Sequence, residues 1–92
     1  MKTLSNYTTE QIKEAVLRHI SNPKKLQKWN LATIAKNINF NEGNYFYENS
    51  DQLKRVDILN TLKGMIEKYG FDEVLKNDWN SEEILSILNK TK

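Results

Sequence analysis

Apolar residues in this 92-residue chain recur at the spacing of an α-helix, and this periodicity constrains the fold more than any other feature. In the first clear stretch, four apolar residues and one histidine share a helical face. They are Ile12, Ala15, Val16, His19 and Ile20. Similar stripes follow within residues 31–38, 51–69 and 84–88. The sequence therefore predicts an all-α fold of five to six helices in one small domain over residues 1–92.

Capping residues predict where these helices begin. Asn30 is expected to cap the second helix and Ser81 the last one, because such side chains accept hydrogen bonds from free backbone amides. Asn49 and Ser50 are both candidates for the cap of the longest helix. The longest helix is expected to turn an apolar stripe toward the core. The stripe consists of Leu53, Val56, Leu59, Leu62, Ile66 and Tyr69. The domain then has a front part at residues 12–53 and a rear part at residues 54–90, in which two short helices follow the long one.

The chain between the second helix and the longest helix contains a predicted turn. Asn39 is expected to end the second helix, because asparagine tolerates the left-handed conformation of a helix C-terminus. Phe40 is then expected to enter the core. Residues 43–47 fit a helix or a short strand equally well. If they are helical, the front part contains a helix-turn-helix unit.

Composition argues against an enzyme. The chain has no cysteine, which excludes disulfides, thiolate metal sites and Cys-His pairs. Its single histidine excludes a metal site built from several histidines and argues against a Ser-His pair. His19 lies on an apolar stripe and is expected to be partly buried and hydrogen-bonded, with a role as a pH switch as the alternative. Three isolated glycines form no phosphate-binding loop. We expect no catalytic residue, no metal, no cofactor and no small-molecule ligand.

The sequence also indicates a cellular compartment and a charge pattern. No apolar run approaches the roughly 18 residues of a membrane span, and the first residues lack a signal-peptide core, so a cytoplasmic protein is expected. The net charge is +2, but residues 1–46 carry +4 and residues 47–92 carry −2. A basic front part permits a polyanionic partner without requiring one.

The front part resembles the DNA-binding region of TetR-type repressors over residues 12–53. Four elements fall without a gap where that family typically has Ile-Ala, Val-Ser, Gly and Tyr. They are Ile34-Ala35, Phe40-Asn41, Gly43 and Phe46. The resemblance covers less than half of the chain, and the family's ligand-binding and dimerising domain has no counterpart in the residues that follow.

The sequence departs from the family at three points. Ile38-Asn39 stands where the family has a small residue and a glycine in the turn. Phe46 lacks the hydroxyl of the family's phosphate-contacting tyrosine, and Gln52 replaces a phosphate-contacting lysine. The segment expected to read DNA carries Glu42 and no lysine or arginine, so contacts to guanine are not expected.

The resemblance implies a DNA-binding regulator or accessory factor with duplex DNA as its partner. The residues placed in the major groove are Asn41, Asn44, Tyr45 and Tyr47. Because asparagine pairs with adenine through two hydrogen bonds, such a surface favours A·T-rich sites. The residues placed against phosphates are Lys24, Lys25, Lys28 and Lys36. Phosphate contacts of this kind supply most of the affinity and make it depend steeply on salt.

The alternative is a protein-binding inhibitor or adaptor, the type of small protein that phages and plasmids encode. Its physical support is a surplus of aromatic and amphipathic surface. The candidate interface residues are Trp79, Leu85 and Leu88 in and beside the last helix, and residues 45–47 add a second aromatic cluster. The same last helix also fits a position in the core. A homodimer through it is compatible with either class of function.

Overall fold

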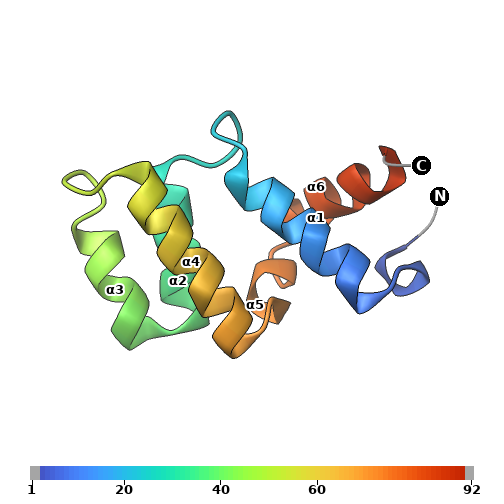
Figure 1. The fold of residues 1–92 in the computed structure, drawn as a ribbon, viewed down its shortest axis with the longest axis horizontal. Helices are drawn as coiled ribbons and strands as arrows, with labels where there is room; N and C mark the ends of the chain where they lie inside the picture. Colours follow the sequence, from blue (N-terminus) through green and yellow to red (C-terminus); the bar gives the residue numbers. More distant parts are fainter. Residues whose placement is uncertain (1–2, 91–92) are drawn as a thin grey trace.

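The computed structural model describes residues 3–90, which form six α-helices and one 3₁₀ turn (Figure 1). The elements are η1 (Leu4–Asn6), α1 (Thr9–Ser21), α2 (Lys28–Ile38), α3 (Phe40–Glu48), α4 (Arg55–Tyr69), α5 (Asp72–Leu75) and α6 (Asp78–Lys90). This part of the chain contains no strand. The predicted all-α fold with five to six helices is confirmed.

Three of the predicted helix starts are wrong by three or four residues. Helix α2 begins at Lys28 with Gln27 as its N-cap, and the Asn30 side chain accepts a hydrogen bond from the Gln27 amide at 2.9 Å. Ser50 is buried in the loop before α4, which begins only at Arg55. Each of these segments contains several residues able to cap a helix. The packing of the helices on one another decides which of these residues becomes the cap.

The start of α6 shows the same effect. The helix begins at Asp78, where the Asn77 side chain accepts a hydrogen bond from the Asn80 amide at 3.2 Å. The Ser81 hydroxyl instead donates to the Leu75 carbonyl and ties the first turn of α6 to α5. The prediction that Ser81 is the N-cap of the last helix is therefore wrong.

The core face of α4 is rotated relative to the predicted stripe. Leu59, Leu62 and Ile66 are buried as expected, whereas Val56 and Tyr69 are exposed. Their places in the core are taken by two other residues of the helix, Ile58 and Met65. Val56 lies off the core face, and Tyr69 is the last residue of the helix. The chain leaves α4 through Gly70, whose φ of +96° favours glycine.

Two groups of helices share one core. At one end of the molecule α4 packs against α2 beside α3, and at the other α1 packs against α6, with α5 between them (Figure 1). The buried apolar residues form a single cluster to which α1, α2, α4, α5 and α6 all contribute. The Arg55 guanidinium joins the two ends, because it donates to the carbonyls of Ile20 at 3.2 Å and Leu26 at 3.2 and 3.3 Å.

A single residue separates α2 from α3. Asn39 has φ −149° and ψ 112°, so it is extended and not left-handed as predicted, and its side chain accepts a hydrogen bond from the Glu42 amide at 3.0 Å. Residues 43–47, for which helix and strand were both open, are helical. Gly43 is buried where α3 crosses α2. A Cβ atom there would lie 2.2 Å from the Lys36 backbone nitrogen, so only glycine permits this approach.

Candidate functional site

The faces of α3 have different surroundings. Gly43 and Phe46 point toward the core, and Phe46 fills the place that was predicted for Phe40. Phe40 is 61% exposed, because the extended Asn39 turns the first residue of α3 outward. Glu42 lies on the side toward α4 and pairs with Lys68 at 3.4 Å. Helix α3 is therefore held to the core by Gly43 and Phe46 and has further contacts on its flanks, while its remaining face is directed to solvent.

The outward face of α3 carries three of the four predicted DNA-base residues. Asn41 and Tyr45 are exposed and Asn44 is half-buried. At 100° per residue, these three positions fall on the side opposite Gly43 and Phe46. Tyr45 also meets the Phe46 ring edge-on at a centroid distance of 5.4 Å.

Tyr47, the fourth predicted base contact, lies on a different side of α3, next to α2. The Lys36 ammonium lies 4.2 Å from the centre of the Tyr47 ring and 5.5 Å from the centre of the Phe40 ring. Phe40 and Tyr47 are seven residues apart, so they share a face of α3 two turns apart. Trp29 and Lys36 have the same spacing on α2.

These four residues form one exposed surface across α2 and α3, which we call the aromatic–lysine surface (Trp29, Lys36, Phe40 and Tyr47). Trp29 and Phe40 are 60% and 61% exposed, and Tyr47 is 44% exposed. A lysine over an aromatic ring gains about 0.5–1 kcal/mol at such exposed sites, which holds the ammonium close to both rings. The surface therefore combines large apolar area with one fixed positive charge.

The four predicted phosphate lysines are not brought together. Lys25 pairs with Glu83 of α6 at 3.6 Å, and the Lys28 ammonium donates to the carbonyls of Asp51 and Leu53 at 3.3 and 3.0 Å. Lys36 belongs to the aromatic–lysine surface, while Lys24 is exposed in the turn after α1. Lys25 is thus directed at α6, Lys28 at the loop before α4, and Lys36 at α3. Their role in binding phosphate stays a prediction.

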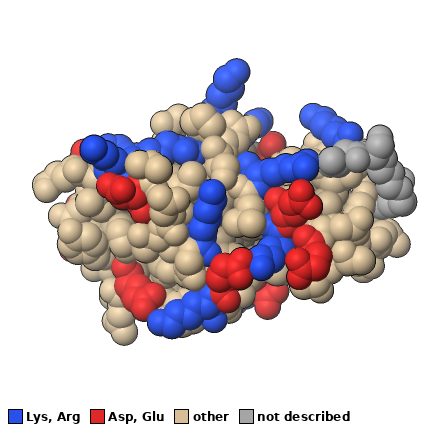
Figure 2. Space-filling model, viewed as in Figure 1, with Lys and Arg blue, Asp and Glu red and all other residues tan. Residues whose placement is uncertain are grey.

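Charges on the molecular surface are also mixed. On the face drawn in Figure 2, basic and acidic side chains alternate over the helices and do not gather into one basic patch. All five ion pairs between described residues join a lysine or arginine to a glutamate, which neutralises part of the basic surface. A phosphate backbone would meet isolated cations on this face.

The predicted interface residues near the C-terminus differ in exposure. Leu88 is 8% exposed and packs in the core between α1 and α6, whereas Leu85 is half-buried on the outer side of α6. Trp79 is 45% exposed, and its ring lies 5.5 Å from that of His19. The last helix therefore closes the core with one side and leaves a smaller apolar area, around Leu85, on the other.

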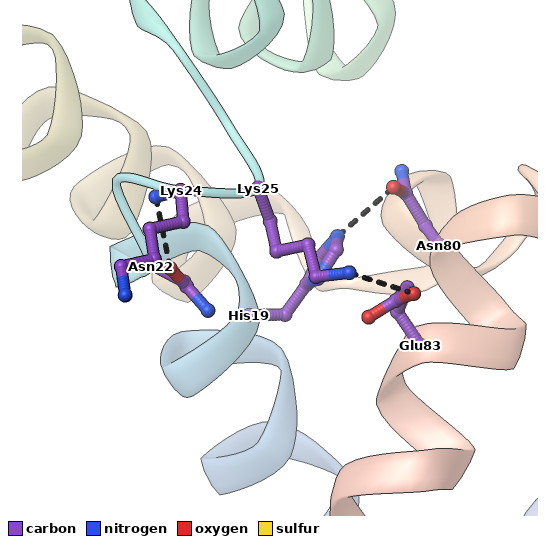
Figure 3. A network of polar contacts seen from close by, with 6 residues as sticks. All are labelled: His19, Asn22, Lys24, Lys25, Asn80 and Glu83. Carbon is purple, nitrogen blue, oxygen red and sulfur yellow. Dashed lines mark hydrogen bonds and ion pairs between the residues drawn. The ribbon is translucent and has the colours of Figure 1, made fainter.

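His19 is the centre of a buried polar contact between α1 and α6 (Figure 3). Its Nε2 atom lies 3.0 Å from the Asn80 Oδ1 atom, and its Nδ1 atom has no partner. Burial lowers the pKa of His19 from its ordinary value of 6.5, and the hydrogen bond with Asn80 opposes this shift in part. Lys25 reaches from the turn after α1 to Glu83, one turn beyond Asn80. The hydrogen-bonded histidine predicted from the sequence is confirmed, and it is more fully buried than expected.

Two of the residue types that often serve catalysis, acidic residues and histidine, are dispersed or buried in the described part of the chain. In residues 3–90 no three histidine, aspartate or glutamate side chains are grouped so as to hold a metal ion. His19 is 1% exposed and does not reach a substrate-accessible surface. Among the described helices, none combines the length and the apolar character needed to cross a membrane.

No protein-family model, curated protein or solved structure matches this chain. The resemblance to TetR-type repressors therefore stays a prediction based on the residues of the front part. The aromatic–lysine surface was not found from the sequence, because Phe40 was assigned to the core and Trp29 was not assigned to a site. The seven-residue spacing within each pair was the available signal, but only the crossing of α2 and α3 places the two pairs together.

Proposed function

We propose that this protein is a small non-enzymatic binding module that docks another protein through its aromatic–lysine surface. The observation that supports this most directly is the exposure of Phe40 and Tyr47 against Lys36, on two helices packed through Gly43. Exposed Trp29 lies two turns from Lys36 on the same face of α2. Exposed apolar residues are ordinary when they are scattered. Two rings against one ammonium, with a tryptophan on the same face of α2, form a patch, and contiguous patches mark interaction sites.

The residue types also favour a protein partner. Tryptophan, tyrosine and phenylalanine are enriched in the centres of protein interfaces, where each buries a large area at a low cost in conformational entropy. The fold does not require rings at these positions, because the core is closed by other residues. The backbone that carries Phe40 and Tyr47 is packed closely on α2, since Gly43 brings the two helices into direct contact.

Two single substitutions test this proposal. The chain would be tagged, crosslinked and purified from the cells that produce it, as the natural sequence and as Trp29→Ala and Tyr47→Ala. Each variant is expected to reduce recovery of the specific partner at least tenfold, which corresponds to the ~1.4 kcal/mol or more typical of a central aromatic contact.

Tyr69→Ala is the matched control, because Tyr69 is exposed to the same extent as Tyr47 (44%) but lies at the end of α4. Thermal unfolding should be nearly unchanged in all three variants, since exposed side chains contribute little to stability. Equal recovery of the same proteins with every variant would place the contact elsewhere and reject the proposal.

A second candidate is binding to duplex DNA, which is favoured by the outward face of α3 with Asn41, Asn44 and Tyr45. Its test is binding to an AT-rich duplex as a function of salt. Affinity should fall steeply between low and moderate salt, and reversing the charges of Lys24, Lys25 and Lys28 should weaken binding and flatten the slope. The absence of binding at low salt would reject this candidate and leave the protein-binding proposal intact.

A further inference from the structure

We infer that the segment bound by the aromatic–lysine surface carries a carboxylate flanked on both sides by apolar side chains. This inference rests on the proposed function and specifies the chemistry of the partner. It depends on the charge of Lys36, which no ion pair between described residues neutralises, on the contacts that occupy Lys28, and on the spacing of the four residues along α2 and α3.

Lys36 has no acidic partner among the described residues. None of the ion pairs between described residues includes it, and its ammonium faces the rings of Tyr47 and Phe40. Its residue is only half exposed, so part of its hydration is already lost. A carboxylate brought to this ammonium under the cover of a partner's side chains forms a charge-assisted hydrogen bond in a site from which water is excluded.

The surroundings permit one such carboxylate and disfavour a polyanion. The nearest other lysine of α2, Lys28, is directed at the carbonyls of Asp51 and Leu53. Glu48 is exposed on the neighbouring outward face of α3 and repels further negative charge. Single-stranded nucleic acids bind where aromatic rings alternate with a continuous basic groove. One lysine without a second cation of α2 free to join it does not supply that groove, so the geometry points to a protein segment.

The length of the surface matches a short amphipathic segment. Trp29 and Lys36 are separated by two helical turns, as are Phe40 and Tyr47, which corresponds to about 10.5 Å along each helix. A helix that places apolar residues at i, i+3 or i+4, and i+7 presents anchors over the same distance. An aspartate or glutamate within that stripe would meet Lys36 while the apolar residues cover the rings.

A library of random 12-residue peptides displayed on phage, selected on the immobilised 92-residue chain, tests this inference without a known partner. Selected sequences are expected to contain an aspartate or glutamate between apolar or aromatic residues. A synthetic peptide of the selected sequence would then be titrated against the natural protein and its variants by fluorescence anisotropy at several salt concentrations.

Lys36→Met keeps the length and the apolar stem of the side chain but removes its charge. This variant should weaken peptide binding about tenfold and abolish most of its salt dependence, whereas Lys36→Arg should stay within about threefold. Tyr69→Ala should bind like the natural protein.

Each contrary outcome has its own meaning. Loss of binding in Trp29→Ala and Tyr47→Ala, but not in Lys36→Met, would overturn the inference about charge and retain the docking surface. Selected peptides that bind all these variants equally would overturn both the inferred carboxylate and the proposed docking surface. Displacement of the peptide by a 15-residue oligo(dT), itself weakened by Lys36→Met, would assign the surface to nucleic acid and overturn the acidic segment.

Discussion

At the residue scale, two helical glycines show how similar positions acquire opposite roles. A Cβ atom on Gly43 would lie 2.2 Å from the backbone of α2, whereas nothing lies within 4 Å of a Cβ atom on Gly64. The first glycine is required by the helix crossing. The second is tolerated in the middle of α4, where glycine costs about 1 kcal/mol relative to alanine.

Gly64→Ala is expected to raise the free energy of unfolding by about 0.5–1 kcal/mol, because alanine loses less backbone entropy on folding and meets no obstacle. Urea unfolding followed by circular dichroism measures this change. Gly43→Ala is the contrasting variant and should lower stability by about 1–3 kcal/mol, since α3 must move away from α2. A similar effect of the two substitutions would contradict the close approach of α3 to α2.

The lowered pKa of buried His19 predicts that the stability of the fold depends on pH. Its folded pKa is lowered by burial below the ordinary 6.5, so the folded state binds fewer protons than the unfolded state once the pH falls to this range. Stability is therefore fully present above about pH 6.5 and decreases below it, with a slope of at most about 1.4 kcal/mol per pH unit.

The difference in unfolding free energy between the natural protein and His19→Gln isolates this contribution, because the carboxylates titrate in both. The natural protein should lose more stability than the variant between pH 7.5 and 5.5. Parallel pH profiles would show that the histidine is not kept neutral at the contact with Asn80.

At the scale of elements, Arg55 links the first turn of α4 to the segment between α1 and α2. Its guanidinium satisfies the carbonyls of Ile20 and Leu26, which otherwise lack partners at the end of α1 and in the following turn. Hydrogen bonds from charged groups to buried acceptors contribute more than neutral ones. The position of α4 thus depends on a polar contact as well as on its apolar face.

Arg55→Met is expected to lower the free energy of unfolding by about 1–3 kcal/mol, because two partly buried carbonyls lose their donors. Lys54→Met is the control from the neighbouring position, where the side chain is exposed, and should change stability by less than about 0.5 kcal/mol. Chemical denaturation measures both. Equal effects would show that Arg55 acts through general charge and not through these hydrogen bonds.

At the scale of the whole molecule, the two ends depend on one core. Residues from α1, α2, α4, α5 and α6 form a single buried cluster, and Lys13 of α1 pairs with Glu67 of α4 at 2.6 Å. The two tryptophans lie in different groups of helices, Trp29 on α2 and Trp79 on α6. They serve as separate reporters of the two ends.

The variants Trp29→Phe and Trp79→Phe each leave one tryptophan. Their fluorescence transitions in urea should coincide with each other and with circular dichroism, because a shared core makes unfolding cooperative. Separate midpoints for the two variants, with unchanged circular dichroism transitions, would show that the α1–α6 end and the α2–α4 end unfold independently.

Local patterns in the sequence determined the all-α class, the stripes of α1 and α2, the break at Asn39 and the burial of His19. These features depend on helical periodicity and on the chemistry of single residues, so they can be predicted without knowledge of distant contacts. Helix starts were harder to predict, because several residues in each segment were able to act as caps.

Only the tertiary structure decided the rotation of α4, the exposure of Phe40 and the assembly of the aromatic–lysine surface. The extended backbone of Asn39 turns Phe40 outward, and the crossing at Gly43 then brings Phe40 and Tyr47 to Lys36. The physical reason is that periodicity specifies which residues share a face of one helix. The angle and distance at which two helices cross are set by packing between residues far apart in the chain.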